Sequence, residues 1–105
     1  MGRRTSAELI VILWRDIPAQ VNGRSGEARH QVILPMRFQK AIDRAAMRAG
    51  KKDTDSYLAE WRRGDPVDCS DDLEAEASAH AARLETEFTD ERLSSLVAAG
   101  GAEAK

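Results

Sequence analysis

The sequence is poor in the residues on which small domains most often build covalent cross-links or metal sites. Among its 105 residues there is one cysteine, Cys69, and there are two histidines, His30 and His80. A single cysteine cannot form an internal disulfide, so the fold does not depend on an oxidising compartment. Neither histidine has a Cys, Asp or Glu partner at a metal-ligand spacing. We therefore expect structural histidines, no metal site and no cofactor.

Catalytic groups are equally scarce. Cys69 is the one candidate nucleophile, and no histidine lies near it in the sequence to act as a base. The carboxylates of Asp68, Asp71 and Asp72 favour the thiol over the reactive thiolate because nearby negative charge raises a thiol pKa. The glycine-rich stretch GRSG at 23–26 opens no helix, so it is not a phosphate-binding loop. The sequence predicts no catalytic residue and a protein that is not an enzyme.

Long apolar runs are also absent. The longest strongly apolar stretch, Leu9 to Trp14, has six residues and ends at Arg15-Asp16. A signal-peptide core needs about 7 to 15 apolar residues and a membrane helix about 20. We therefore expect a soluble, cytoplasmic protein without a membrane partner.

The apolar residues that are present predict an N-terminal sheet. Three strands are expected, at about 8–15, 18–23 and 28–34, with GRSG as the hairpin connection between the second and third. The first strand is apolar on both faces, as in strands inside a covered sheet. Because one small chain offers few elements to cover it, we expect a second chain to cover one face or one edge of the sheet.

Helical patterns fill the rest of the chain. A first helix should follow Pro35 and end at Gly50. A second, capped by Asp53 or Thr54, should reach Gly64 and bury Tyr57, Leu58 and Trp61. Two more helices should begin after Ser70-Asp71-Asp72 and at Thr89. The predicted class is α+β, a three-stranded antiparallel sheet followed by three to four helices, in one domain at 8–98 between a disordered segment at 1–7 and a frayed end at 99–105.

Charge is distributed unevenly along the chain. Residues 1–63 hold 13 basic and 7 acidic residues, whereas residues 64–105 hold 3 basic and 11 acidic residues. Such asymmetry marks either an interaction surface or two solvated faces that attract each other within one fold.

A basic stripe on the first predicted helix is the best candidate for phosphate contact. Its residues recur at spacings of three and four and are Arg37, Lys40, Arg44 and Arg48. The alternative is an ordinary solvated helix face that pairs with the acidic third helix. Both interpretations stay open on the sequence.

The stretch HQVILPMRFQKAIDRAAMRAGKKDTDSYLAEWRR, at 30–63, resembles ribbon-helix-helix proteins. The resemblance implies a DNA-binding transcriptional regulator. Two features depart from that family. Ile33 would occupy an outward strand position, where it cannot read the donors and acceptors of a base. Two further strands also precede this one. DNA binding is therefore the alternative hypothesis.

A second resemblance covers more of the chain, from Glu8 to Phe88. The segments WRDIPAQV, VILPMRFQKAIDRAAMRAG and DSYLAEWRRGDP, with LEAEA after them, resemble the small bacterial virulence factor domain. That family implies no established enzymatic activity. It implies a helper of an enzyme of folate-linked one-carbon metabolism or methyl transfer. Our first hypothesis is thus a non-catalytic accessory or protein-interaction module, with an enzyme or a second copy as partner.

The segment WRDIPAQV is also a candidate protein interface, because aromatic and Arg residues are enriched at binding hot spots. The candidate residues are Trp14, Arg15, Asp16, Ile17 and Trp61. The alternative is a structural corner in which Trp14 is buried and Arg15 is paired with a carboxylate.

Overall fold

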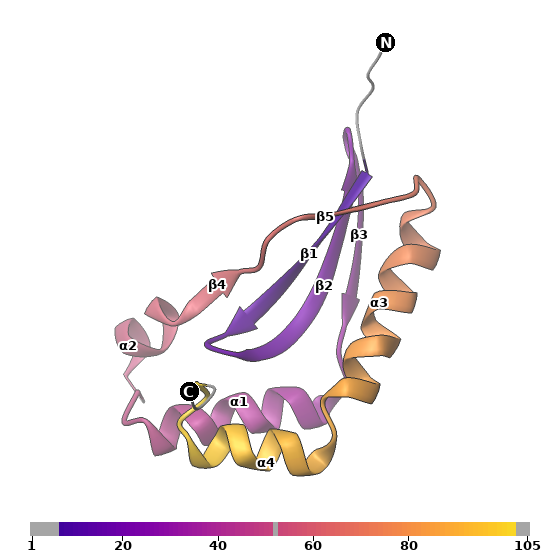
Figure 1. Cartoon of the computed structure of the whole chain (residues 1–105). Coiled ribbons are helices and arrows are strands. Elements are labelled where there is room, and N and C mark those ends of the chain that lie inside the picture. The colour runs from indigo at the N-terminus through magenta and orange to yellow at the C-terminus, as the bar shows by residue number, and fades with distance from the viewer. Residues whose placement is uncertain (1–6, 52, 103–105) are drawn as a thin grey trace.

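The computed structural model describes residues 7–51 and 53–102 and shows an α+β fold (Figure 1). The strands β1 (Ala7–Trp14), β2 (Ile17–Ser25) and β3 (Ala28–Ile33) form an antiparallel sheet. The helices are α1 (Met36–Arg48), α2 (Thr54–Ala59), α3 (Leu73–Glu87) and α4 (Asp90–Ala98). The predicted fold class is confirmed.

Both hairpins of the sheet have two-residue turns. Trp14 pairs with Ile17, and Ser25 pairs with Ala28. Gly26, the first central residue of the second turn, has φ +61°, as type II′ turns require. The four-residue connection expected at 23–26 is therefore too long. Gly23 stays in β2 because it is paired on both sides, with Leu9 of β1 and His30 of β3.

Two short strands were not predicted from the sequence. β4 (Trp61–Arg63) and β5 (Val67–Cys69) both pair antiparallel with β1, on the side away from β2. The order is β3-β2-β1-β4, with β5 also on β1, so β1 is an internal strand. Both edges of β1 are therefore covered within this chain, and the expectation that a second chain covers one face or one edge of the sheet stays a prediction.

One helix lies along the sheet, and two others lie at one end of it. Figure 1 shows α3 along β2 and β3, while α1 and α4 lie side by side below the strand ends. The buried residues of the core include Val21, Phe38, Ile42, Ala77 and Leu96. Leu58 is 57% exposed, so its predicted place in the core is wrong, whereas Tyr57 and Trp61 are half-buried. No helix in the described part of the chain is long and apolar enough to cross a membrane.

The helices α2, α3 and α4 begin at residues whose side chains cap them, and α1 ends at a glycine. The side chains of Asp53, Asp72 and Thr89 accept hydrogen bonds from the first turns of α2, α3 and α4. Gly50 ends α1 with φ +73°. These positions confirm the helix boundaries expected from the sequence, apart from the end of α2.

The ends of the predicted domain differ in part from expectation. The Gly101 N–H donates to the Leu96 carbonyl at 2.7 Å, and the Gly101 carbonyl accepts from Asp16 N–H at 2.9 Å. Gly101 is thus held by two backbone hydrogen bonds, residues 103–105 lie outside the described residues, and the frayed end expected at 99–105 stays a prediction. The disorder expected at 1–7 falls on residues 1–6, which lie outside the described residues, and on Ala7, which begins β1.

Candidate functional site

Trp14 lies inside the protein rather than on its surface. Its side chain is 0% exposed, its Nε1 donates to the Tyr57 carbonyl at 2.8 Å, and its ring stacks on Tyr57 at 5.8 Å. Ile17, its partner across the turn, is also 0% exposed. Neither residue can touch another protein in this fold, so the predicted interface does not include them.

Arg15 occupies the turn itself and is held from several sides. Its φ of 53° lies in the left-handed region, which non-glycine residues seldom adopt. Arg15 Nε lies 3.2 Å from Glu60 Oε1, and Nη1 donates to the Gly100 carbonyl at 3.0 Å. The Arg15 N–H donates to the Glu60 carbonyl at 3.0 Å. The hydrogen bond from Arg15, with help from Lys51, lowers the pKa of Glu60.

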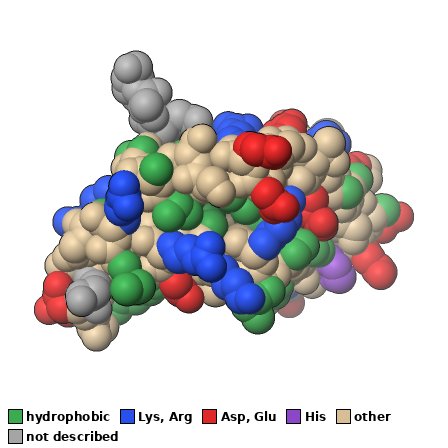
Figure 2. Space-filling model, turned by 90° about the horizontal axis from the view of Figure 1, so that it is seen from below, with side chains coloured by type: hydrophobic (Ala, Val, Ile, Leu, Met, Phe, Trp, Pro, Cys, Tyr) green, Lys and Arg blue, Asp and Glu red, His purple; other side chains and the backbone are tan. Residues whose placement is uncertain are grey.

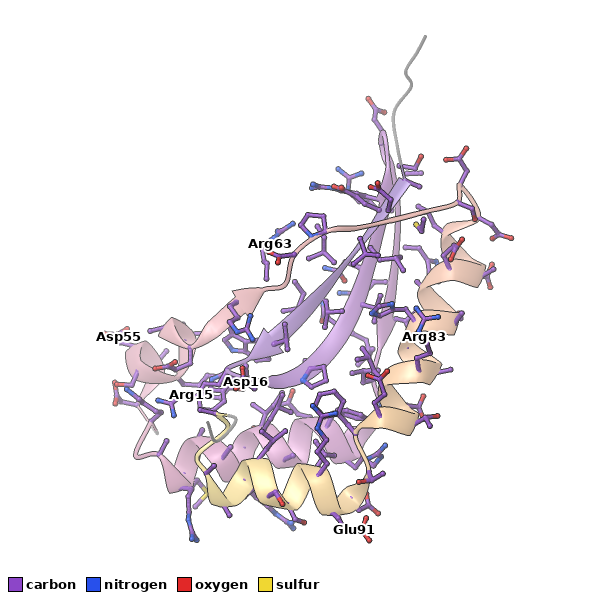
Figure 3. The ribbon with its side chains drawn as sticks, in the orientation of Figure 1. Arg15, Asp16, Asp55, Arg63, Arg83 and Glu91 are labelled. Atoms are coloured by element: carbon purple, nitrogen blue, oxygen red, sulfur yellow. The ribbon has the colours of Figure 1, made fainter. Side chains whose placement is uncertain are left out.

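Asp16, which lies beside Arg15 in Figure 3, and Trp61 complete this corner. Arg62 donates through Nη2 to Asp16 Oδ1 at 3.0 Å and through Nε to the Arg15 carbonyl at 2.8 Å. Trp61 meets the Tyr57 ring edge-on at 6.0 Å. The corner thus ties the β1–β2 turn to α2, β4 and the end of α4. The structural alternative for WRDIPAQV, with Trp14 buried and Arg15 paired to a carboxylate, is what the fold shows.

The basic stripe of α1 divides into one structural residue and three exposed ones. Arg37 Nη1 donates to the Phe88 carbonyl at 2.6 Å, and its Nη2 donates to the Glu85 carbonyl at 2.8 Å. Nη1 also lies 3.3 Å from Asp90 Oδ1. A cation at the last carbonyls of α3 stabilises that helix end. Arg37 is therefore a clamp between α1, α3 and α4 and is not free for phosphate.

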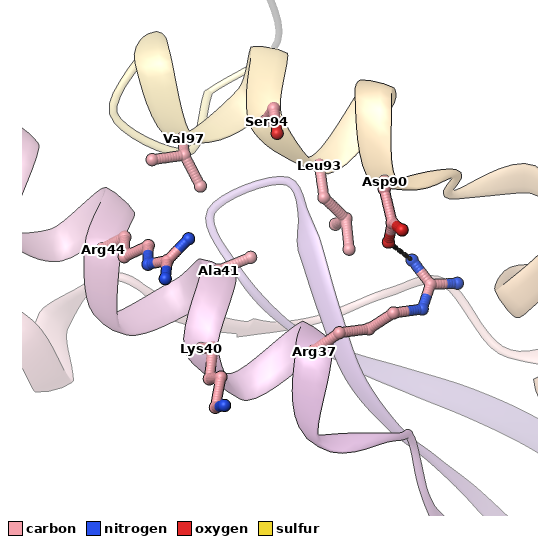
Figure 4. A pocket seen from close by; sticks show the side chains of 8 residues that line it. All are labelled: Arg37, Lys40, Ala41, Arg44, Asp90, Leu93, Ser94 and Val97. Carbon is pink, nitrogen blue, oxygen red and sulfur yellow. Dashed lines mark hydrogen bonds and ion pairs between the residues drawn. The ribbon is translucent and has the colours of Figure 1, made fainter.

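Lys40 and Arg44 border a groove between α1 and α4 (Figure 4). Both are exposed, and neither forms an ion pair or side-chain hydrogen bond with another described residue. The groove encloses about 290 Å³, and its floor is apolar, formed by Ala41, Leu93 and Val97. Figure 4 shows the guanidinium of Arg44 pointing toward Ala41 on the groove side of α1, while the side chain of Lys40 points away from α4 at the outer side of α1. Arg48, the last residue of the stripe, is exposed outside the groove.

The charges of this surface are only partly paired with the acidic part of the chain. Figure 2 shows Lys and Arg side chains over the α1–α4 face, with hydrophobic and acidic side chains among them. Arg37–Asp90 joins the basic and acidic parts of the chain, whereas Arg15–Glu60, Arg24–Glu8 and Arg62–Asp16 stay within the basic part. Lys40 and Arg44 thus present positive charge beside an apolar floor.

The other candidate residues lie apart from this groove. Cys69 is partly buried in β5, and burial, followed by the carboxylates of Glu76 and Asp68, raises the pKa of its thiol. That direction agrees with the sequence-based prediction. His80 lies on α3, where burial and Arg83 lower its pKa and Arg83 Nη2 lies 2.9 Å from Nδ1. No group of three potential metal ligands forms among the described residues.

The sequence identifies only one wall of the groove. The spacing of the basic stripe indicates the α1 side. The α4 side, with Leu93, Ser94 and Val97, has helical spacing as well. No pattern within either segment predicts that residues 90–97 pack against residues 37–44. That placement depends on the Arg37 clamp and on the turn between α3 and α4.

Together, the sheet, the tied corner and the open groove define a small α+β domain with an exposed cationic surface between two helices. The chain belongs to the virulence factor family, since the family model described as "Virulence factor" matches residues 12–97. The resemblance found in the sequence is confirmed. No curated protein and no solved structure matches the chain. The matched region includes both the corner at Trp14 and the whole groove.

Proposed function

We propose that this domain is a non-catalytic protein-interaction module that binds its partner through the α1–α4 groove. The observation that supports the proposal is the pair of exposed cations, Lys40 and Arg44, beside the apolar floor of Ala41, Leu93 and Val97. Protein interfaces combine an apolar centre, which supplies affinity, with a charged rim, which supplies specificity and fast association. The groove has both parts within two helices.

The resemblance to the virulence factor domain adds a partner class to this proposal. It implies that the module assists an enzyme of folate-linked one-carbon metabolism or methyl transfer. Such an enzyme is the first partner to test. A second copy of this chain is the other partner considered from the sequence.

DNA binding is the second candidate function, and one observation favours it. β3 is the terminal strand of the sheet, and α1 and α2 follow it in the order seen in ribbon-helix-helix proteins. Two residues weaken the case. Ile33 is 65% exposed at the outward strand position that would meet bases, and Arg37 is held inside the fold. A protein partner fits these residues better than a DNA duplex does.

Photo-crosslinking in cells of the source organism tests the proposal. A benzophenone amino acid replaces Ser94 in the groove or, as the control, Ser78 on the exposed side of α3. We expect a discrete protein adduct from position 94 and none of the same mass from position 78. The adduct should disappear when Lys40→Glu and Arg44→Glu are combined and should persist with Arg48→Glu. Identical adducts from both positions, or none from position 94, would contradict the proposal.

A further inference from the structure

Resting on that function, we infer that the groove receives an acidic amphipathic helix of the partner protein. Three properties of the groove define this occupant: its course along two helices, the spacing of its cations, and its apolar floor.

The course of the groove calls for a helix. α1 and α4 run parallel, because Arg37 lies beside Asp90 at their N-terminal ends and Gly100 adjoins Ala49 at the other end. The lining residues recur every three or four positions on both helices, which places them in two ridges with a furrow between them. A third helix packs into such a furrow with residues at the same spacing, as in helix-in-groove recognition.

The cations select negative charge on that helix. Lys40 and Arg44 are four residues apart, which is about 6 Å along the axis of α1. Two carboxylates one turn apart on a docked helix have the same spacing. Among the described residues, Asp90 is the one acidic residue that lines the groove; it is paired with Arg37 at 3.3 Å, and Asp43 of α1 accepts from Gln39 at 2.9 Å. The charge of Lys40 and Arg44 is thus available to a partner.

The apolar floor excludes simpler occupants. Ala41 and Leu93 are buried, and Val97 is half-buried at the base of the groove. A small side chain at Ala41 leaves room beside Leu93 for an apolar side chain from the partner. An inorganic phosphate would use the two cations but would leave the partly exposed side chain of Val97 without an apolar contact. A helix that carries carboxylates beside an apolar stripe satisfies both features.

Mapping the crosslinked peptide tests the inference separately from the function. The adduct formed from position 94 is digested, and the partner peptide is identified by mass spectrometry. We expect a segment with at least two Asp or Glu residues three or four positions apart beside apolar residues. A basic or neutral segment, any segment of a second copy of this chain, or a nucleic acid would overturn the inference, because the inferred occupant is an acidic helix of a different protein. A captured protein with the wrong segment leaves the proposed function standing, whereas the absence of any protein adduct removes both.

A synthetic peptide of the captured segment then measures the charge contribution. Combining Lys40→Glu with Arg44→Glu should weaken the peptide Kd by about tenfold or more, because like charges face each other in the complex. Arg48→Glu, the same reversal outside the groove, should change it less than about twofold. A peptide with its two carboxylates replaced by lysine should bind the double variant better than the original peptide does. Equal affinities across these pairs would overturn the inference.

Discussion

At the scale of single residues, Gly101 sets how closely the chain can approach Trp14. A Cβ at position 101 would lie 2.8 Å from Trp14 Cζ3, and the φ of Gly101 is +94°. Gly50 has a similar φ of +73° but open space around it. The two positions therefore separate the cost of the backbone conformation from the cost of the contact.

We expect Gly101→Ala to destabilise the protein by about 3 kcal/mol, because left-handed strain adds to overpacking. Gly50→Ala should cost about 1 kcal/mol, from backbone strain alone. Urea unfolding followed by tryptophan fluorescence measures both variants. Equal losses at the two positions would show that Trp14 moves aside without cost.

Glu60 links the corner to acid stability. Its pKa is lowered by Arg15 in the folded protein, so its contribution is present above the unfolded pKa of about 4.3 and is lost as pH falls through the folded pKa. Glu60→Gln should therefore lower the melting temperature near neutral pH. The difference from the unmodified protein should shrink as pH falls below about 4. Thermal unfolding over this pH range tests the prediction, and a constant difference would contradict it.

At the scale of elements, Arg37 is a clamp, and its neighbours on the stripe are not. Arg37→Ala removes the hydrogen bonds to the carbonyls of Glu85 in α3 and of its C-cap Phe88, together with the contact with Asp90, so it should destabilise by about 1–2 kcal/mol after allowance for its partial exposure. Arg44→Ala is the matched control and should stay within about 0.5 kcal/mol. Chemical unfolding compares them. A similar loss in both variants would mean that Arg44 has a structural partner as well.

The elements that the sequence predicted are those with local signals. The first three strands and the caps at Asp53, Asp72 and Thr89 depend on patterns within about ten residues. β4 has no such signal, because Trp61–Arg63 continues a helical pattern and becomes a strand only where β1 offers an open edge. The burial of Trp14, which the sequence placed at a candidate interface, was missed for a related reason. Its burial depends on Tyr57 and Gly101, which are distant in the sequence.

At the scale of the whole molecule, the charge asymmetry of the sequence survives folding. α3 exposes Glu74, Glu85 and Glu87, while the α1 side of the groove exposes Lys40 and Arg44. The sequence left open whether the basic and acidic parts form an interaction surface or attract each other within the fold. The ion pair Arg37–Asp90 is the main support for attraction within the fold. The candidate site could be predicted on α1, where spacing is visible, but not as a groove. Its second wall comes from residues about 50 positions further along the chain.

The same charge distribution limits what the protein can do with DNA. The exposed cations of the stripe are Lys40, Arg44 and Arg48, because Arg37 is engaged. Each phosphate neutralised adds about −0.9 to the slope of log K against log salt, so three contacts give a slope of about −3. Three phosphate contacts are far fewer than the roughly 6–10 contacts that give a protein a steep salt dependence. The acidic side chains of α3 also repel the phosphate backbone. We therefore expect weak binding without sequence preference.

Fluorescence anisotropy tests this expectation with a duplex from the promoter of the protein's own gene and with a scrambled duplex of equal length. The two affinities should agree within about twofold at physiological salt, and Arg44→Ala should reduce the salt slope by about one. Arg37→Ala should leave the slope unchanged, because its charge is already engaged by α3 and Asp90. A clear preference for the promoter duplex, with a footprint at one site, would favour the ribbon-helix-helix alternative. The outward positions of β3, such as Ile33, would then lie against bases in a complex that includes a second chain.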